Sequence, residues 1–366
     1  ADLDLAYRMQ SLMHARDSGR NRTNHLLSAD GGVELVRERL FFNADATQSM
    51  GSGQGGVVSS TSNAVAGVRL DTVTTWSAGP RFQYRLGSVA ALETEVRREH
   101  VDFGSRTEGD SESEVLTAGL TSGPMFTTWG WAVDYTRRDE EVTRGSAGGG
   151  GESVEESQLE RLRGELNLRA TASTQLFVAG GTERNEFETA EAGDPVDGDF
   201  WEVGVRWNPA RTISLEAAAG ERFFGDTARG SLSIRGSALD LQLGYSETVT
   251  TASSIQELEF SLPAQQGSIV LPTVVDEVIV QERANARLVW DHSHTTASLS
   301  FFVTDREFQR TGRTEQTRQS DLDISWARLP RTTVTGGIRF RERELSSATA
   351  VDETTSVRLG ATRRLS

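Results

Sequence analysis

The sequence predicts an all-β fold: a single closed antiparallel transmembrane β-barrel of about 18 strands that takes up residues 1–366. Two observations predict it. First, apolar and polar residues alternate along arm after arm, and a period of two places successive side chains on opposite faces of a strand. Second, short turns alternate with longer polar connections along the chain. Short periplasmic turns and longer acidic extracellular loops are typical of bacterial outer-membrane barrels.

The hairpin at residues 201–220 shows the pattern most clearly. The apolar side chains of its first arm share one face, namely Trp201, Val203, Val205 and Trp207. The turn follows at Asn208-Pro209, two residue types that favour turns. Ile213 and Leu215 then begin an equally regular second arm.

The same alternation predicts the remaining strands. In chain order, strands are expected around residues 3–9, 27–35, 40–46, 76–84, 90–96, 116–120, 129–135, 162–170, 175–187, 201–207, 213–220, 232–234, 239–245, 284–290, 297–303, 322–326, 334–340 and 357–361. Short turns are expected near residues 37, 87, 124, 172, 209, 236, 292 and 330. Pro80 has no backbone N–H to donate to a sheet, so we expect it near a strand end or a bulge.

The composition agrees with a barrel that meets lipid with alternate residues only. Mean hydropathy is −0.43, and no run of 18 apolar residues could form a membrane-spanning helix. Without cysteine, disulfides and thiol nucleophiles are excluded. The chain ends Arg364-Leu365-Ser366 rather than in the aromatic common to barrels, so we expect its ends to be trimmed.

The net charge of −15 is concentrated in three connections. Segments 104–114, 139–160 and 185–199 together hold 17 Asp/Glu and 2 Arg, which gives 2 − 17 = −15, and the remainder is neutral. We therefore expect acidic loops on one rim and no nucleic-acid partner.

The tryptophans lie on the apolar face near the expected strand ends, where amphipathic rings favour the membrane interface. They are Trp76, Trp129, Trp131, Trp201, Trp207, Trp290 and Trp326. The alternative is ordinary packing in a β-sandwich. The inner faces of a sandwich would need more large residues than the apolar faces of these strands have, since alanine and glycine occupy many of their positions.

The sequence gives little support to catalysis, and we expect neither an enzyme nor a cofactor. His292 and His294 share one strand face but lack an obvious third metal ligand, so a solvated turn is the favoured interpretation. The carboxylate pairs Glu140-Glu141 and Glu155-Glu156 are expected in loops, where calcium binding would be nonspecific. The glycine run 148–151 is not followed by Lys-Ser/Thr and is not a phosphate loop.

Arginine on the polar face is the more informative feature. The arginines expected to line a lumen are Arg81, Arg85, Arg161, Arg163, Arg169, Arg206, Arg235, Arg283, Arg287, Arg339 and Arg341. Two interpretations stay open. The arginines form cross-strand ion pairs that brace a wet wall, or they form a positive strip that attracts anionic solutes.

The long connection 252–277 is less polar than a free loop. It contains Phe260, Leu262, Ile269 and Leu271, and long apolar loops are usually packed on something. It is expected either to narrow the lumen or contact a partner, or to extend the two neighbouring strands above the membrane.

The segment Thr75-Trp-Ser-Ala-Gly-Pro80-Arg-Phe-Gln-Tyr84-Arg-Leu-Gly87 and recurring turns such as Trp207-Asn-Pro-Ala-Arg-Thr-Ile213 carry a resemblance. The chain resembles the porin-like outer-membrane β-barrel proteins associated with PEP-CTERM/exosortase exopolysaccharide loci. The resemblance implies an exit for a secreted polysaccharide, acting with a periplasmic polysaccharide export protein, in contact with outer-membrane lipids. No functional residue is carried over from it.

Two other functions stay open beside this porin-like conduit in the bacterial outer membrane. One is a general diffusive porin for small anionic solutes. The other is a barrel sleeve around a multihaem cytochrome that transfers electrons across the outer membrane. Because the chain lacks haem-attachment cysteines, the haem would belong to the cytochrome partner.

Overall fold

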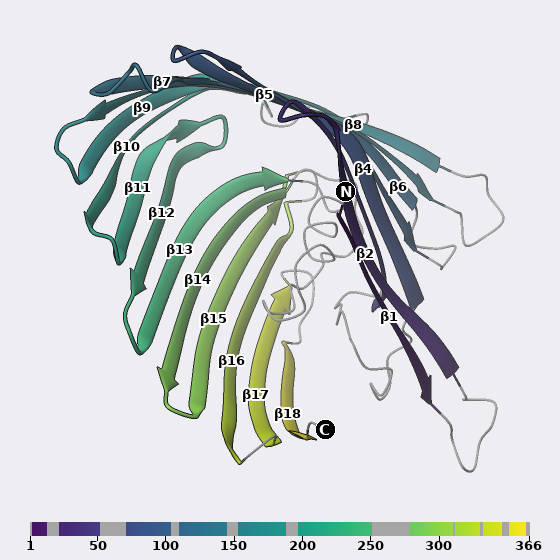
Figure 1. Ribbon diagram of the computed structural model, residues 1–366. Coiled ribbons are helices and arrows are strands. Elements are labelled where there is room, and N and C mark those ends of the chain that lie inside the picture. Colours follow the sequence, from purple (N-terminus) through teal and green to yellow (C-terminus); the bar gives the residue numbers. More distant parts are fainter. Residues whose placement is uncertain are drawn as a thin grey trace. The chain divides into compact units, whose positions relative to one another are not determined.

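A computed structural model describes residues 2–12, 22–51, 71–103, 110–144, 153–187, 197–250, 279–309, 312–329, 332–345 and 351–363. These residues form one antiparallel sheet of 18 strands and contain no helix (Figure 1). The strands are β1 (Asp2–Leu12), β2 (Arg22–Val36), β3 (Leu40–Gly51), β4 (Asp71–Leu86), β5 (Ala90–Phe103), β6 (Asp110–Ser122), β7 (Trp129–Arg144), β8 (Ser153–Arg169), β9 (Thr174–Phe187), β10 (Gly198–Ala210), β11 (Ile213–Arg222), β12 (Gly225–Arg235), β13 (Leu239–Thr250), β14 (Ile279–His292), β15 (Thr295–Phe308), β16 (Thr314–Leu329), β17 (Thr332–Leu345) and β18 (Asp352–Arg363). Over the described ranges, no helix is long and apolar enough to cross a membrane.

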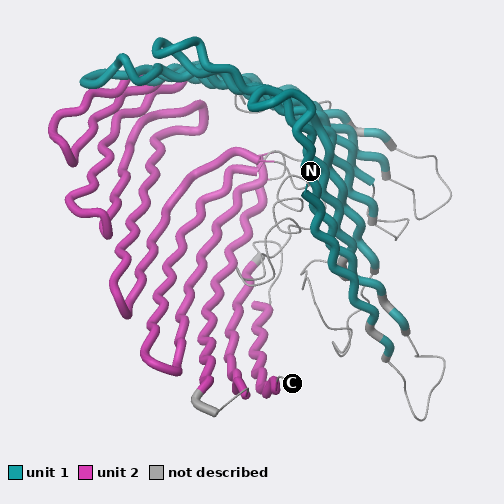
Figure 2. The backbone as a smooth tube through the Cα atoms, viewed as in Figure 1, with its two compact units in different colours: residues 1–165, 181–199, 251–277 teal, residues 166–180, 200–250, 278–366 magenta. Residues whose placement is uncertain are grey.

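The chain divides into two compact units, drawn in different colours in Figure 2. Unit 1 comprises residues 1–165, 181–199 and 251–277, and unit 2 comprises residues 166–180, 200–250 and 278–366. In unit 1, each strand from β1 to β7 pairs with the next in the chain. In unit 2, β10 to β18 do the same. The described residues do not show the sheet closing on itself, so closure into a barrel is a proposal.

The predicted strand count is confirmed, and the predicted short turns lie between the expected pairs of strands. One position is wrong: Asn208 and Pro209 belong to β10, at an irregularity of the β10–β11 register, and the turn follows at residues 211 and 212. The β2–β3 turn follows Val36, and the β4–β5 turn contains Gly87 at φ 59°. One further short turn, between β11 and β12, was missed. It places Gly225 at φ 120°, a conformation that glycine adopts without the steric penalty of a Cβ.

In each unit, apolar side chains dominate one face of the sheet, called the apolar face. Polar and charged side chains dominate the opposite face, called the polar face. On the apolar face, Trp201, Val203 and Leu239 are exposed by 52%, 53% and 48%. The neighbouring Leu243 is exposed by 39% and lies between Leu232 and Ala286 in the register. These side chains are therefore not buried between two packed sheets, which a β-sandwich would require.

The two faces change character along the strands of unit 1, away from the short turns. On the apolar face, Val96 of β5 is followed by Arg98, and Leu116 of β6 is preceded by Glu114. On the polar face, the same ends carry buried Val73 and Val101. Strands that leave lipid for water would show this exchange, because a charged exterior suits water and a small core can then form inside.

This exchange corrects the predicted extent of the acidic loops. β6 begins at Asp110, β7 continues to Arg144 and β8 begins at Ser153, so parts of segments 104–114 and 139–160 are strand. The third segment, 185–199, likewise includes the end of β9 and the start of β10. The sequence did not predict strand at these ends because polar side chains occur on both faces there, so apolar and polar residues do not alternate.

The predicted position of Pro80 is wrong in one respect. Pro80 lies in the middle of β4, opposite Phe42 of β3. On its other side the β4–β5 ladder keeps its register but has no pair between Ala78↔Arg98 and Arg81↔Glu95. Proline therefore occupies a local interruption of the ladder, as its missing N–H requires, rather than a strand end.

Candidate functional site

The polar face of unit 1 carries an ion-pair network across β5, β6 and β7. Arg138 Nη1 donates to Glu99 Oε2 at 2.8 Å, and Arg138 Nε lies 3.6 Å from Glu140 Oε2. Ser111 Oγ donates to Glu140 at 2.9 Å and Ser113 Oγ to Glu99 at 3.2 Å. Each carboxylate therefore has both a charged and a neutral partner, as buried charges need.

The polar face of unit 2 carries a second network, built around a buried ring. Phe177 is 3% exposed, and the Arg206 guanidinium carbon lies 4.2 Å from its ring centroid. Arg206 Nε lies 3.3 Å from Glu216 Oε2, and Arg229 Nε lies 3.1 Å from Glu202 Oε2. Arg229 also pairs with Glu216. Two arginines and two glutamates thus form a neutral wall over an aromatic ring.

The Phe177 ring occupies space that Gly204 leaves open, which gives a sharp test of this packing. A methyl group at Gly204 would overlap the ring and lie 2.6 Å from Ala217 O. We expect Gly204→Ala to destabilise the protein by about 1–3 kcal/mol, the usual cost of overpacking. Equilibrium unfolding in detergent or lipid measures this. Gly230→Ala is the matched control, since its nearest atom is Glu216 O at 3.5 Å; equal effects of the two changes would contradict the packing.

A third network is the most deeply buried. Arg343 of β17 donates from Nε and Nη2 to the two oxygens of Glu315 of β16, both at 3.1 Å. Arg306 of β15 donates to Glu315 Oε1 at 3.2 Å and to Gln281 Oε1 at 3.1 Å. The side chains of Arg306, Arg343 and Glu315 are exposed by only 1%, 2% and 3%.

Five of the eleven predicted arginines pair with carboxylates instead of forming a positive strip. Arg81 lies 2.6 Å from Glu93, Arg161 lies 3.1 Å from Glu183, and Arg163 lies 2.7 Å from Glu165. Arg206 and Arg339 also pair with carboxylates. Four of these pairs cross strands, as the bracing interpretation expects. Arg163 and Glu165 both lie on β8, but Arg163 is also 3.8 Å from Asp134 of β7.

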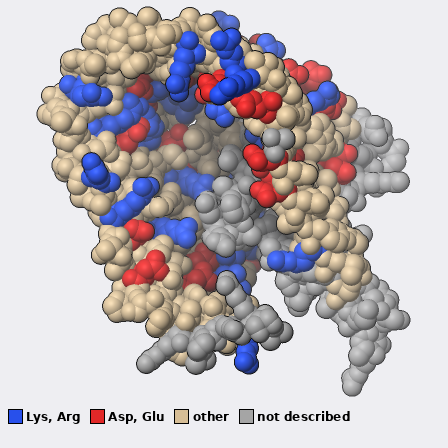
Figure 3. Space-filling view, viewed as in Figure 1, with Lys and Arg blue, Asp and Glu red and all other residues tan. Residues whose placement is uncertain are grey.

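The other six predicted arginines have varied surroundings. Arg341 is buried, Arg287 is half-buried, and Arg283 lies 5.9 Å from the centroid of the Phe302 ring. The three near short turns, Arg85, Arg169 and Arg235, are exposed. Interleaved basic and acidic side chains are visible on the face drawn in Figure 3.

Sequence reasoning missed four arginines of these networks: Arg138, Arg229, Arg306 and Arg343. Each lies in a strand segment that was assigned to a loop or left unassigned. Continuing the alternation by a few residues would have placed Arg306 beyond Thr304, and Arg343 beyond Arg341, on the polar face. Their partners on other strands follow only from the register.

The other predicted site residues have mixed outcomes. Six of the seven tryptophans are exposed on the apolar face, while Trp131 is half-buried; their place at a membrane interface stays a prediction. The constriction residues Phe260, Leu262, Ile269 and Leu271 lie outside the described residues. His292 and His294 are exposed. In the described ranges, no group of three or more His, Asp or Glu could hold a metal ion.

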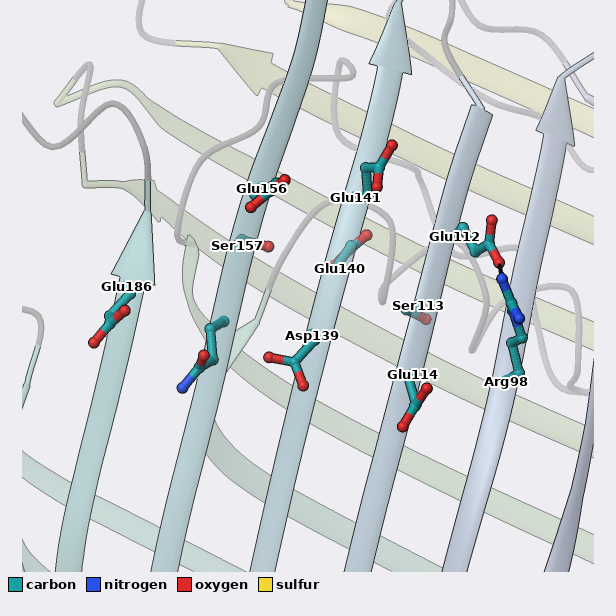
Figure 4. A pocket seen from close by; sticks show the side chains of 11 residues that line it. Arg98, Glu112, Ser113, Glu114, Asp139, Glu140, Glu141, Glu156, Ser157 and Glu186 are labelled. Atoms are coloured by element: carbon teal, nitrogen blue, oxygen red, sulfur yellow. Dashed lines mark hydrogen bonds and ion pairs between the residues drawn. The ribbon is translucent and has the colours of Figure 1, made fainter.

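An open acidic hollow of about 550 Å³ lies on unit 1 (Figure 4). Its carboxylates come from β6, β7, β8 and β9, and Arg98 of β5 is its one arginine. Glu112 lies opposite Glu141, and Glu114 opposite Asp139, in the β6–β7 register. Glu140 and Glu141 therefore belong to a strand, which corrects their predicted place in a loop. The hollow is a solvated, charged continuation of the apolar face.

The chain is similar in fold to solved bacterial receptors. A mutant of the ferric enterobactin receptor PfeA from Pseudomonas aeruginosa is 10% identical, with 100% of this chain and 73% of that chain covered and a TM-score of 0.50. The siderophore receptor PirA from Acinetobacter baumannii is 8% identical, with 98% and 73% covered and a TM-score of 0.51. No protein-family model matches the sequence, and no curated protein matches it. At these identities, the similarity shows the fold alone.

Proposed function

We propose that this protein is a non-enzymatic outer-membrane β-barrel that conducts an exopolysaccharide to the cell surface, together with a periplasmic polysaccharide export protein. One observation supports the outer-membrane β-barrel: a sheet of 18 strands has an exposed apolar face and, opposite it, a polar, ion-paired face. In lipid, such a sheet must close so that its edge groups are hydrogen-bonded. Its fold similarity to outer-membrane receptors supports the same location.

A closed barrel of ~16–18 strands leaves an aqueous channel unless it is plugged. The polar face, with the predicted arginines, would line that channel. Its charges are largely paired within the wall, as in the networks around Arg138 and Arg229. A wall of this kind binds a hydrated sugar chain weakly, and weak binding lets a cargo leave. The cargo itself is proposed from the resemblance to barrels of exopolysaccharide loci.

Deletion of the gene in its native host tests the transport proposal. We expect surface polysaccharide to disappear while polymer accumulates in the periplasm, and a plasmid copy of the full chain to restore export. Normal surface polysaccharide in the deletion strain would refute the cargo.

The deletion strain, together with measurements on the purified protein, separates the two alternative functions. A diffusive porin for small anions would give a persistently open, anion-selective conductance in planar bilayers and a deletion strain with normal polysaccharide. A cytochrome sleeve would co-purify with haem absorbance.

A further inference from the structure

One accessible stretch of the polar face in unit 2 lies between two ion-pair networks, one on β10–β12 and the other on β15–β17. It is built on β13, β14 and β15, which are neighbours in the sheet (Figure 1). Two adjacent rows of the register cross it: Gln242, Arg287 and Ser300, then Gly244, Asn285 and Phe302. Gln242 is exposed and the other side chains are half-buried. A dissolved molecule can therefore reach this surface.

Arg287 is the one charged side chain in these two rows. In the part of the chain that the structure describes, no ion pair or hydrogen bond engages it. Asp240 of β13 lies opposite Val289, one row away from Arg287. Asp321 lies beyond Ser300 on β16 and already pairs with Arg339. The guanidinium of Arg287 therefore keeps its five N–H donors for water or a ligand.

The neutral polar groups beside Arg287 are also unengaged. A Cβ atom at Gly244 would lie 2.6 Å from Asn285 Oδ1, so the Asn285 amide lies across the glycine. Gln242 and Ser300 flank Arg287 on the two neighbouring strands. Among the described residues, none accepts a hydrogen bond from the side chains of Gln242, Asn285 or Ser300, and none donates one to them. Amide and hydroxyl groups both donate and accept, as the hydroxyl groups of a sugar do.

Phe302 differs from the other phenylalanines on the polar face of unit 2. Phe177, Phe200 and Phe308 are exposed by only 3%, 5% and 5%, whereas Phe302 is half-buried. Apolar surface left in contact with water is unfavourable in proportion to its area. A ligand with one apolar side would therefore gain free energy by covering the accessible part of this ring.

We propose that Gln242, Asn285, Arg287, Ser300 and Phe302, here called the Arg287 surface, bind the hydroxyl groups and one ring face of a sugar chain. A bare anion would leave the amide oxygens without a donor and the Phe302 ring uncovered, so a sugar fits better than an anion. Each polar group exchanges water for a sugar hydroxyl, with a small net gain. The chain is therefore held weakly enough to move on. The proposal rests on the proposed function and names where the wall contacts its cargo.

Saturation-transfer NMR on the purified full chain in detergent tests the proposal with a linear glucose hexamer and with polyethylene glycol of similar length. We expect the hexamer to bind and polyethylene glycol, which has hydroxyl groups only at its ends, to bind at least about tenfold more weakly. Arg287→Met should weaken hexamer binding about tenfold, and Gln242→Met about three- to tenfold, the values of a charged and a neutral hydrogen bond. Arg211→Met is the matched control, an exposed arginine in the β10–β11 turn, and should leave binding unchanged.

Four results would overturn the proposal: no binding of the hexamer, equal binding of polyethylene glycol, displacement of the hexamer by an equal concentration of inorganic phosphate, or unchanged binding in Arg287→Met or Gln242→Met. Circular dichroism of each variant shows whether it is folded. Binding to the purified protein does not depend on export in cells. Hexamer binding without an export defect in the deletion strain would therefore refute the transport function alone, and an export defect without hexamer binding would refute the Arg287 surface alone.

Discussion

Leu243→Arg is expected to destabilise the protein by about 2–4 kcal/mol in lipid, the cost of a charged side chain on the lipid face of a membrane barrel near mid-depth. Leu243 is 39% exposed and lies in a row of apolar side chains that crosses four strands. The row runs Leu232, Leu243, Ala286 and Phe301. If lipid covers this row, the guanidinium loses its hydration and finds no carboxylate nearby.

The control for Leu243→Arg is Ser231→Arg, on the polar face of β12. Ser231 is exposed and lies opposite Glu216, which already pairs with Arg206 and Arg229, so a new arginine there meets water instead of lipid. We expect its effect to stay within about 0.5 kcal/mol, as for ordinary surface changes. Reversible unfolding from lipid vesicles measures both variants. A stable, well-inserted Leu243→Arg protein would contradict lipid contact, because an exposed arginine in water carries no such cost.

The strands with strict alternation were predictable from sequence alone. β10 and β13 alternate along most of their length, and the structure places their apolar side chains on one exposed face. β12 was predicted only at Leu232 and Ile234. Its first half, from Gly225 to Gly230, offers small and charged residues on both faces, so the pattern that marks a strand is absent there although the ladder to β11 is regular.

The site was predictable in kind but not in detail. Alternation assigns Arg206 or Arg339 to the polar face, yet it does not say which carboxylate lies opposite. A shift of one residue in register exchanges every partner, and Glu315 contacts Arg306 and Arg343 from strands on either side of β16. Such a three-strand contact depends on two registers at once, and the sequence fixes neither.

Glu315→Gln is expected to have the largest effect of the changes within the polar face. Removing the charge of Glu315 leaves Arg306 and Arg343, exposed by 1% and 2%, without their shared carboxylate. Loss of one partner from a buried ion pair costs about 3–5 kcal/mol, because the remaining charge stays buried and uncompensated. Two buried arginines share this one carboxylate, so we expect a loss within that range in equilibrium unfolding.

Asp323→Asn is the matched control, because it also removes one carboxylate of β16 that pairs with an arginine of another strand. Asp323 and Arg358 lie 3.2 Å apart, but their side chains are 50% and 63% exposed. Exposed pairs contribute about 0–1 kcal/mol, so this change should be small. If both variants lost the same stability, burial would not be what makes the Glu315 network strong. A much larger loss in Glu315→Gln would mean that the burial of Arg306, Arg343 and Glu315, and not pairing as such, makes this network strong.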